Sequence, residues 1–340
     1  MDFRCISSMR HQYVKRQTGE VETEKLIADR LVNRMYCSAR EEPGRLFEIL
    51  TSPRVSKLLG LLQFDLSLGP ARLGNGRLES FGIDWSETVD PPQSMRTLRE
   101  VFERKIRYWE CRPMDPDPQV VVSPADSRIL LGSFRDTSCL FLKEKFFHYE
   151  ELIGPQKAHW LHAFDRGDFA VFRLTPEKYH YNHTPVAGEV LDIYEIPGRY
   201  HSCNPGAVVN AMTPFSKNKR TVTILDTDVP RGSGVGLVAM IEIVALMIGD
   251  IVQCYSEERY EDPKPVRKGM FLRRGTPKSL YRPGSSTDVL LFQEGRVHFS
   301  ADLLENMHRP GVSSRFSAGF GRPLVETDLE VRSTIGRAAS

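Results

Sequence analysis

From residue 119 onward the sequence is a series of short β-type segments separated by turn residues, and this pattern limits the folds open to the chain. Segments rich in Val, Ile, Leu and Phe with the length of strands are residues 119–122, 129–134, 139–142, 168–174, 189–196, 208–210, 221–226, 236–245 and 289–292. Strand and helix patterns do not alternate regularly, which argues against a doubly wound parallel sheet. We predict an α+β protein with N-terminal helices followed by a mainly antiparallel β-domain.

The region before residue 119 has helical periodicity instead. Apolar residues recur at helical spacing in residues 22–36 and again in residues 98–109, where Ser94 or Thr97 is a suitable N-cap. Residues 55–68 are mostly apolar and indicate a core helix or, alternatively, an interfacial helix on a lipid surface. We divide the chain into a helical region at 1–90, a β-domain at 91–310 and a loosely ordered tail at 311–340 that is rich in Arg, Ser and Gly.

Composition excludes several classes of function. A formal net charge of +2 over 340 residues gives no global attraction to nucleic acid. The six cysteines contain no Cys-x-x-Cys pair, so neither a zinc site nor a disulfide framework is indicated, and a reducing, cytoplasmic setting fits best. The most apolar stretch, residues 235–248, is too short for a membrane span and contains Glu242. We expect a soluble protein with at most peripheral membrane contact.

Three polar motifs border the predicted strands. They are Ser123-Pro124-Ala125-Asp126, then Tyr179-His180-Tyr181-Asn182-His183-Thr184-Pro185, then Gly284-Ser285-Ser286-Thr287 before an apolar run that ends at Phe292. Each has an ordinary explanation: a turn Asp that bonds its own backbone, structural histidines, and a Gly-Ser turn before a strand. The i,i+3 spacing of the histidines suits a metal on a helix, but no third ligand is nearby and the neighbours favour extended structure, so no metal site is predicted.

Taken together, the motifs resemble the phosphatidylserine decarboxylase family, whose enzymes make a pyruvoyl cofactor from a serine of their own chain. That family has Ser-Pro-x-Asp-Gly, His-x-x-His-x-Pro and Gly-Ser-Thr stretches in the same order. The resemblance covers roughly residues 94–292 and includes Tyr200-His201-Ser202-Cys203-Asn204-Pro205. The chain departs from the family at Ser127 and Ser285, where glycine is usual, and in a longer interval between Lys268 and Ser286.

The resemblance implies a role for each motif residue. His183 matches the general base, Asp126 the residue that orients it, and His180 a residue that shapes the substrate pocket. Ser286 lies six residues before Phe292, as the reactive serine does in the family, and Ser285 is its rival. Cleavage between Ser285 and Ser286 would convert Ser286 into the pyruvoyl group, whose ketone can bond a substrate amine and accept electrons as carbon dioxide leaves.

The resemblance therefore implies a pyruvoyl-dependent carboxy-lyase that converts phosphatidylserine to phosphatidylethanolamine in phospholipid biosynthesis. It also implies that the two cleaved fragments stay together as a heterodimer and that two such heterodimers form a dimer. A soluble decarboxylase of a free amino acid is an alternative on the same scaffold, because the longer interval before Ser286 adjoins the site. A non-catalytic β-domain that binds lipid or a protein partner is a second alternative. A serine hydrolase is disfavoured by the absence of a Gly-x-Ser-x-Gly elbow.

Overall fold

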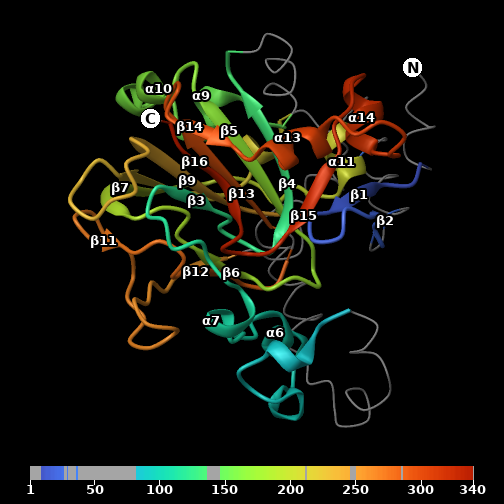
Figure 1. Cartoon of the computed structure of the whole chain (residues 1–340), viewed down its shortest axis with the longest axis horizontal. Helices are drawn as coiled ribbons and strands as arrows, with labels where there is room; N and C mark the ends of the chain where they lie inside the picture. The colour runs from blue at the N-terminus through green and yellow to red at the C-terminus, as the bar shows by residue number, and fades with distance from the viewer. Residues whose placement is uncertain are drawn as a thin grey trace.

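The computed structural model describes residues 9–26, 29, 36, 82–135, 146–210, 213–245, 250–284 and 286–339. Within these residues the protein is α+β and mostly β-sheet, as predicted (Figure 1). The large sheet has the strand order β11 (Phe271–Leu272), β7 (Gly188–Ile196), β8 (Arg220–Asp226), β9 (Leu237–Val244), β13 (Ser286–Phe292), β5 (Asp168–Leu174), β4 (Ser127–Ser133), β15 (Glu326–Leu329), β1 (Gln12–Lys15) and β2 (Val21–Thr23).

Two smaller sheets and short helices complete the described part of the chain. The sheets are β10 (Ile251–Gln253), β12 (Pro277–Tyr281) and β6 (Tyr181–His183), and β14 (Val297–Phe299), β16 (Thr334–Ala338) and β3 (Val120–Val122). The α-helices are α6 (Leu98–Phe102), α7 (Tyr108–Cys111), α9 (Tyr149–Ile153), α10 (Ala158–Phe164), α11 (Pro205–Asn210), α12 (Pro214–Lys217), α13 (Ala301–Met307) and α14 (Arg315–Phe320), and Trp85–Glu87 and Pro92–Ser94 form 3-10 turns. No described helix is long and apolar enough to cross a membrane.

The large sheet is centred on β13. All seven residues of this strand pair in antiparallel register with β5 on one side and β9 on the other. The described neighbours in the sheet are antiparallel except β1 and β15, which run parallel. A strand with partners on both sides cannot leave the sheet without breaking two ladders of hydrogen bonds.

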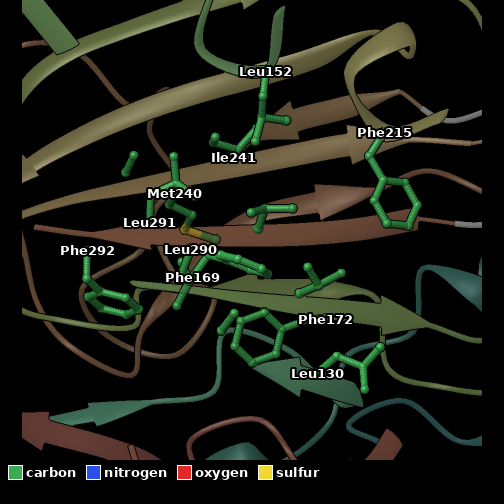
Figure 2. Close-up of a cluster of buried hydrophobic side chains, with 14 of the residues drawn as sticks. Leu130, Leu152, Phe169, Phe172, Phe215, Met240, Ile241, Leu290, Leu291 and Phe292 are labelled. Atoms are coloured by element: carbon green, nitrogen blue, oxygen red, sulfur yellow. The ribbon is translucent and has the colours of Figure 1, made fainter. Parts of the chain in front are cut away.

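The hydrophobic core lies along these three strands (Figure 2). Phe172, Met240 and Leu290 are fully buried, and Leu152 of α9 and Phe215 of α12 pack into the same cluster. Both faces of the central strands are covered, which explains why residues 289–292 form an unbroken apolar run instead of an alternating one. Each fully buried side chain of this kind contributes about 1.5–3 kcal/mol to folding.

Several sequence predictions are confirmed within the described residues. Strands β3, β4, β5, β7, β8, β9 and β13 coincide with predicted segments to within a few residues. Thr97 caps α6: its side chain accepts a hydrogen bond from the amide of Glu100, whose carboxylate accepts one from Thr97 in return. The apolar stripe at 98–109 forms two short helices, α6 and α7, instead of one.

Other predictions are wrong. The first described elements are not helices but β1 and β2, so residues 22 and 23 lie in a strand of the large sheet, although Asp29 and Tyr36 are helical. Residues 208–210 end helix α11 instead of forming a strand. Pro205 suits the first position of a helix, and the Asn204 side chain accepts the amide of Gly206 there, which outweighs the β-branched valines. The predicted strand at 139–142 and the apolar segment 55–68 lie outside the described residues.

The predicted loose tail is wrong as well. Residues 311–340 contain α14, β15 and β16, and β15 lies inside the large sheet between β4 and β1. Its polar composition suggested disorder, but Glu326 is buried and ion-paired with Arg173 of β5 at 2.6 Å. A charged residue such as Glu326 can be buried when it is paired across the sheet, but the sequence pattern alone predicts that a charged residue is exposed to solvent.

Candidate active site

Backbone hydrogen bonds join the first two sequence motifs to each other and to Tyr281, which lies three residues before the third motif. The amide of His183 in β6 donates to the carbonyl of Pro124 at 2.7 Å, and the amide of Tyr281 in β12 donates to the carbonyl of His180 at 3.0 Å. Strands β6 and β12 also pair with each other in the small sheet. Figure 1 shows this sheet between the large sheet and helices α6 and α7.

Ser286 is the first residue of β13, the central strand. Ser286 is 1% exposed, and its Oγ has no hydrogen-bond partner among the residues that the structure describes. Its register partners, Leu174 and Val244, belong to a small apolar cluster that also contains Ala125. The turn before Ser286 is entered through Gly284, whose φ of 145° lies in a region that favours glycine. Ser285 lies outside the described residues.

His183 is buried and neutral. Its Nδ1 is 3.0 Å from the carbonyl oxygen of Gly275, which can only accept, so we assign the proton to Nδ1. Nε2 therefore carries the lone pair and accepts from the Tyr179 hydroxyl at 2.9 Å. Burial lowers the pKa of His183 to about 3, although the bond to Gly275 opposes this shift. The arrangement holds a neutral imidazole with its basic atom, Nε2, directed at Tyr179.

His180 is also fully buried, on the side of α6. Its ring stacks on Phe102 with centroids 3.5 Å apart, and Nε2 lies 3.4 Å from the carbonyl oxygen of Pro176. Burial, and then the positive charge of Arg104, lower the pKa of His180 to about 3. Nδ1 of His180 has no hydrogen-bond partner in the described part of the chain. His180 is thus a second neutral imidazole in this part of the protein.

Asp126 is held by an arginine that the sequence reasoning did not single out. Nε and Nη2 of Arg112 donate to its two carboxylate oxygens at 3.1 and 2.9 Å, and the amide of Val331 donates to one of them at 2.7 Å. Arg112 also binds both carboxylate oxygens of Glu87, at 2.6 and 2.9 Å. Burial alone would raise the pKa of Asp126, but the charge and hydrogen bonds of Arg112 lower it below its ordinary value. Asp126 is therefore ionised.

The predicted site residues share a neighbourhood but not a hydrogen-bonded chain. In the described part of the protein, no hydrogen bond joins Asp126 to His183 or His183 to Ser286. The charge of Asp126 nevertheless acts on both histidines, since it opposes the lowering of the pKa of His180 and His183. The sequence motifs named Asp126, His180 and His183, but not the hydroxyl and guanidinium groups that hold them, and a joint role with Ser286 stays a prediction.

A buried polar network lies beside Ser286 and was also missed. The hydroxyl of Tyr281 donates to Asp288 at 2.6 Å and accepts from the amide of Ile243 at 3.0 Å. Burial, and then the charge of Glu242, raise the pKa of Asp288 well above its ordinary value. Glu242 itself pairs with the fully buried Lys278 at 2.7 Å. The sequence signal was present as acidic residues inside apolar strands, which are rarely buried without partners.

One cluster in the described residues has the donor atoms for a metal ion: His11, Glu24 and Glu326. Its carboxylates are already neutralised by arginines. Arg173 binds Glu24 and Glu326, each at 2.6 Å, and Arg128 binds Glu24 at 2.5 Å. A buried ion network explains this cluster without a metal, and it ties the first strands of the chain to β4, β5 and β15.

A pocket of about 430 Å³ opens beside the motifs. Asp126 and Tyr179 are among its lining residues, whereas His180, His183 and Ser286 are not. The rest of the lining carries charges of both signs, including Arg104, Lys178, Glu87 and Asp328. A volume in this range accommodates a small molecule or the polar part of a larger one.

Comparison with known proteins agrees with this arrangement. The family model for phosphatidylserine decarboxylase matches residues 98–318. A phosphatidylserine decarboxylase proenzyme of Chlamydia trachomatis is 30% identical over 323 residues, covering 90% of this chain and 98% of the relative. The corresponding proenzyme of Fusobacterium nucleatum is 29% identical and covers 87% of this chain and 91% of the relative. Proenzyme 3 of Schizosaccharomyces pombe is 27% identical over 298 residues, covering 86% of this chain and 28% of that protein. The match spans all three motifs and most of the sheet that holds them, and the chain belongs to the phosphatidylserine decarboxylase family.

Proposed function

We propose that this chain cleaves itself between Ser285 and Ser286, forms a pyruvoyl group at Ser286, and decarboxylates phosphatidylserine to phosphatidylethanolamine. The observation that carries the proposal is the state of Ser286. It is buried at the start of the central strand, its Oγ has no hydrogen-bond partner among the described residues, and the chain just before it, at Tyr281, bonds the backbone of His180. A stable polar group would be hydrogen-bonded in such a place, whereas a reactive one need not be.

In the proposed cleavage, Nε2 of His183 takes the proton of the Ser286 hydroxyl. The freed oxygen attacks the carbonyl carbon of Ser285, so that the peptide bond becomes an ester and the nitrogen of Ser286 becomes an amine. Loss of the α-proton of Ser286 breaks its Cβ–Oγ bond, releases the carboxylate of Ser285 and leaves dehydroalanine. Tautomerisation and attack by water release ammonia and leave a ketone at position 286. Ser285 is the rival precursor.

Three residues would support this chemistry. The neutral state of His183 suits a base, because protonated imidazole has no lone pair to offer. Tyr179 must release Nε2 before the base can act, since its hydroxyl occupies that lone pair. Asp126 stays ionised and would stabilise the imidazolium through its charge, as it already opposes the lowered pKa of His183.

The pyruvoyl group would supply a ketone that bonds the substrate amine and accepts the electrons released with carbon dioxide. Burial of the surrounding residues would exclude water from the carbanion that develops, and His180 would form part of the substrate pocket through its neutral ring. The two fragments would stay associated, because β13 pairs on both sides with strands of the larger fragment.

We also propose that the enzyme works as a dimer of cleaved chains and contacts the membrane surface through residues 55–68. A lipid substrate must be reached at a bilayer, and an apolar segment of this length can lie in its interface. Replacing Leu58 and Leu62 by Asp should weaken binding to anionic vesicles and leave self-cleavage intact. Loss of folding in that variant would assign these residues to the core.

Intact-mass measurement combined with a decarboxylation assay tests the main proposal. Wild-type protein should split into residues 1–285 and a fragment with a ketone at position 286, which borohydride and an amine would label. Ser286→Ala should give one uncut, inactive chain, whereas Ser285→Gly should still be cut. Cleavage that depends on Ser285 instead would move the precursor by one residue. Release of carbon dioxide from free serine but not from phosphatidylserine would favour the amino-acid decarboxylase.

A further inference from the structure

Arg104 is a buried cation that the mechanism above does not use. It follows α6, lines the pocket beside Asp126, and is 6% exposed. Its described hydrogen bonds go only to backbone carbonyl oxygens, those of Val101 at 3.2 Å and Glu177 at 2.7 Å. A guanidinium group has five N–H donors, so these two bonds leave part of it available.

Each of the other basic residues that line the pocket has a carboxylate partner within the described structure. The pairs are Lys15 with Glu22, Arg16 with Asp302, Arg112 with Glu87 and Asp126, and Lys178 with Asp328. Arg104 has no carboxylate within salt-bridge distance among the described residues. It therefore differs from its neighbours in the feature that matters for binding an anion.

A buried cation without a direct carboxylate partner is costly. The charges of Asp126, Glu87 and Glu177 offset only part of the effect of burial on the pKa of Arg104. Burial lowers the pKa of Arg104 to about 10, so the side chain remains positively charged at neutral pH. The lining around it contains acidic residues as well, which suits a ligand that carries charges of both signs. The planar fork of a guanidinium matches the oxygens of a phosphate or a carboxylate.

We propose that Arg104 binds the phosphodiester of the substrate headgroup and thereby selects a phospholipid over a free amino acid. The proposal rests on the decarboxylase function proposed above. The substrate carboxylate is a poorer candidate ligand, because it loses its charge as carbon dioxide forms. A cation bound there would stabilise the ground state more than the transition state. The phosphodiester keeps its charge throughout the reaction, so binding it strengthens substrate affinity without opposing the chemistry.

The test is a binding measurement on the uncut Ser286→Ala protein, with two soluble probes. The probes are glycerophosphoserine and glycerophosphoethanolamine. Both probes carry the phosphodiester and an ammonium group, and glycerophosphoserine alone also carries the carboxylate. Titration calorimetry should show that Arg104→Met weakens both by a similar factor of about 10 to 100, the usual effect of losing a charged hydrogen-bond partner. Arg104→Lys keeps the positive charge but not the two-pronged guanidinium, so its affinity for each probe should lie between that of the parent and that of Arg104→Met. Lys105→Met removes a neighbouring cation that does not line the pocket and should bind like the parent.

If Arg104→Met weakened the binding of glycerophosphoserine alone, Arg104 would be assigned to the carboxylate and the proposal would be wrong. Unchanged binding of both probes would also overturn it. Self-cleavage of Arg104→Met in the chain that retains Ser286 shows that this variant folds. The underlying function fails separately: wild-type protein that binds both probes through Arg104 but releases no carbon dioxide from phosphatidylserine would leave the binding site standing without the decarboxylase.

Discussion

The amide of His183 donates a 2.7 Å hydrogen bond to the carbonyl oxygen of Pro124, which joins two motifs that are far apart in the sequence. Pro124 lies two residues before Asp126, so this bond fixes the strand with the imidazole next to the turn with the carboxylate. Because it is a backbone bond, it does not depend on the protonation state of either side chain. The geometry that places the His183 strand beside the Asp126 turn is therefore part of the fold.

The contact between Tyr179 and Nε2 of His183 gives the first prediction. Tyr179→Phe removes the hydroxyl that occupies the lone pair of the base, so self-cleavage should proceed at least as fast as in the parent. His183→Ala should block it, because a serine hydroxyl is a poor nucleophile without a base. Gel electrophoresis of freshly made protein measures the appearance of the fragments. Tyr260→Phe is the control, since its hydroxyl touches Tyr179 but not the imidazole. A Tyr179→Phe chain that stays uncut would show that the hydroxyl itself takes part.

A second prediction concerns acid stability. The pKa of His183 is about 3 in the folded chain, and its ordinary value is 6.5. The unfolded chain therefore binds more protons between these pH values, and stability falls as the pH drops through that window. The contribution of His183 should decrease by about 2 kcal/mol between pH 7 and pH 5.

Urea unfolding of Ser286→Ala at several pH values measures this effect. Other buried groups titrate in the same range, so the informative quantity is the difference in slope between this protein and one that also carries His183→Gln. The double variant should lose less stability on acidification. Equal slopes would mean that His183 keeps an ordinary pKa in the folded chain.

The sequence predicted the central strands because they depend on local patterns, and local motifs also named the candidate site residues, whose roles stay predictions. Residues 168–174 and 289–292 are apolar runs of strand length, and each becomes a central strand. Ser286, His183 and Asp126 stood in recognisable motifs. Glu326 did not, since its burial depends on Arg173, which is distant in the sequence and adjacent only after the sheet has formed.

The same reason explains the site residues that were missed. Arg112 reaches Asp126 from the position directly after helix α7, and Tyr260 reaches Tyr179 from a loop that follows β10. Neither residue belongs to a motif that names its partner. Local propensity predicts a secondary structure, but a buried charge or hydroxyl is explained only by the tertiary contact that satisfies it.

The pairing of Arg112 with Asp126 gives a third prediction. Arg112→Met leaves an ionised carboxylate buried without its cation and should lower the free energy of unfolding by about 3–5 kcal/mol. Adding Asp126→Asn removes the unpaired charge and should recover part of this loss. Arg166→Met, which breaks an exposed pair with Glu294, should change stability little. Chemical denaturation in the uncut Ser286→Ala background provides the comparison. A large effect at Arg166 with none at Arg112 would contradict the assignment.

The last prediction concerns what holds the fragments together after cleavage. In the proposed cleavage Tyr281 falls in the larger fragment, and Thr287 and Asp288 fall in the smaller one. The Tyr281 hydroxyl lies 2.6 Å from the Asp288 carboxyl group and 3.0 Å from the Thr287 carbonyl oxygen. Tyr281→Phe leaves these buried groups with one partner fewer, which should cost about 1–3 kcal/mol and lower the urea concentration at which the fragments separate. Size-exclusion chromatography across a urea series measures that midpoint.

Tyr149→Phe is a matched control, because its hydroxyl bonds Leu161 within the larger fragment. Because β13 pairs with β5 and β9 along its whole length, the Tyr281→Phe fragments should still elute together without urea. Separation of the wild-type fragments in plain buffer would mean that the sheet opens once the chain is cut.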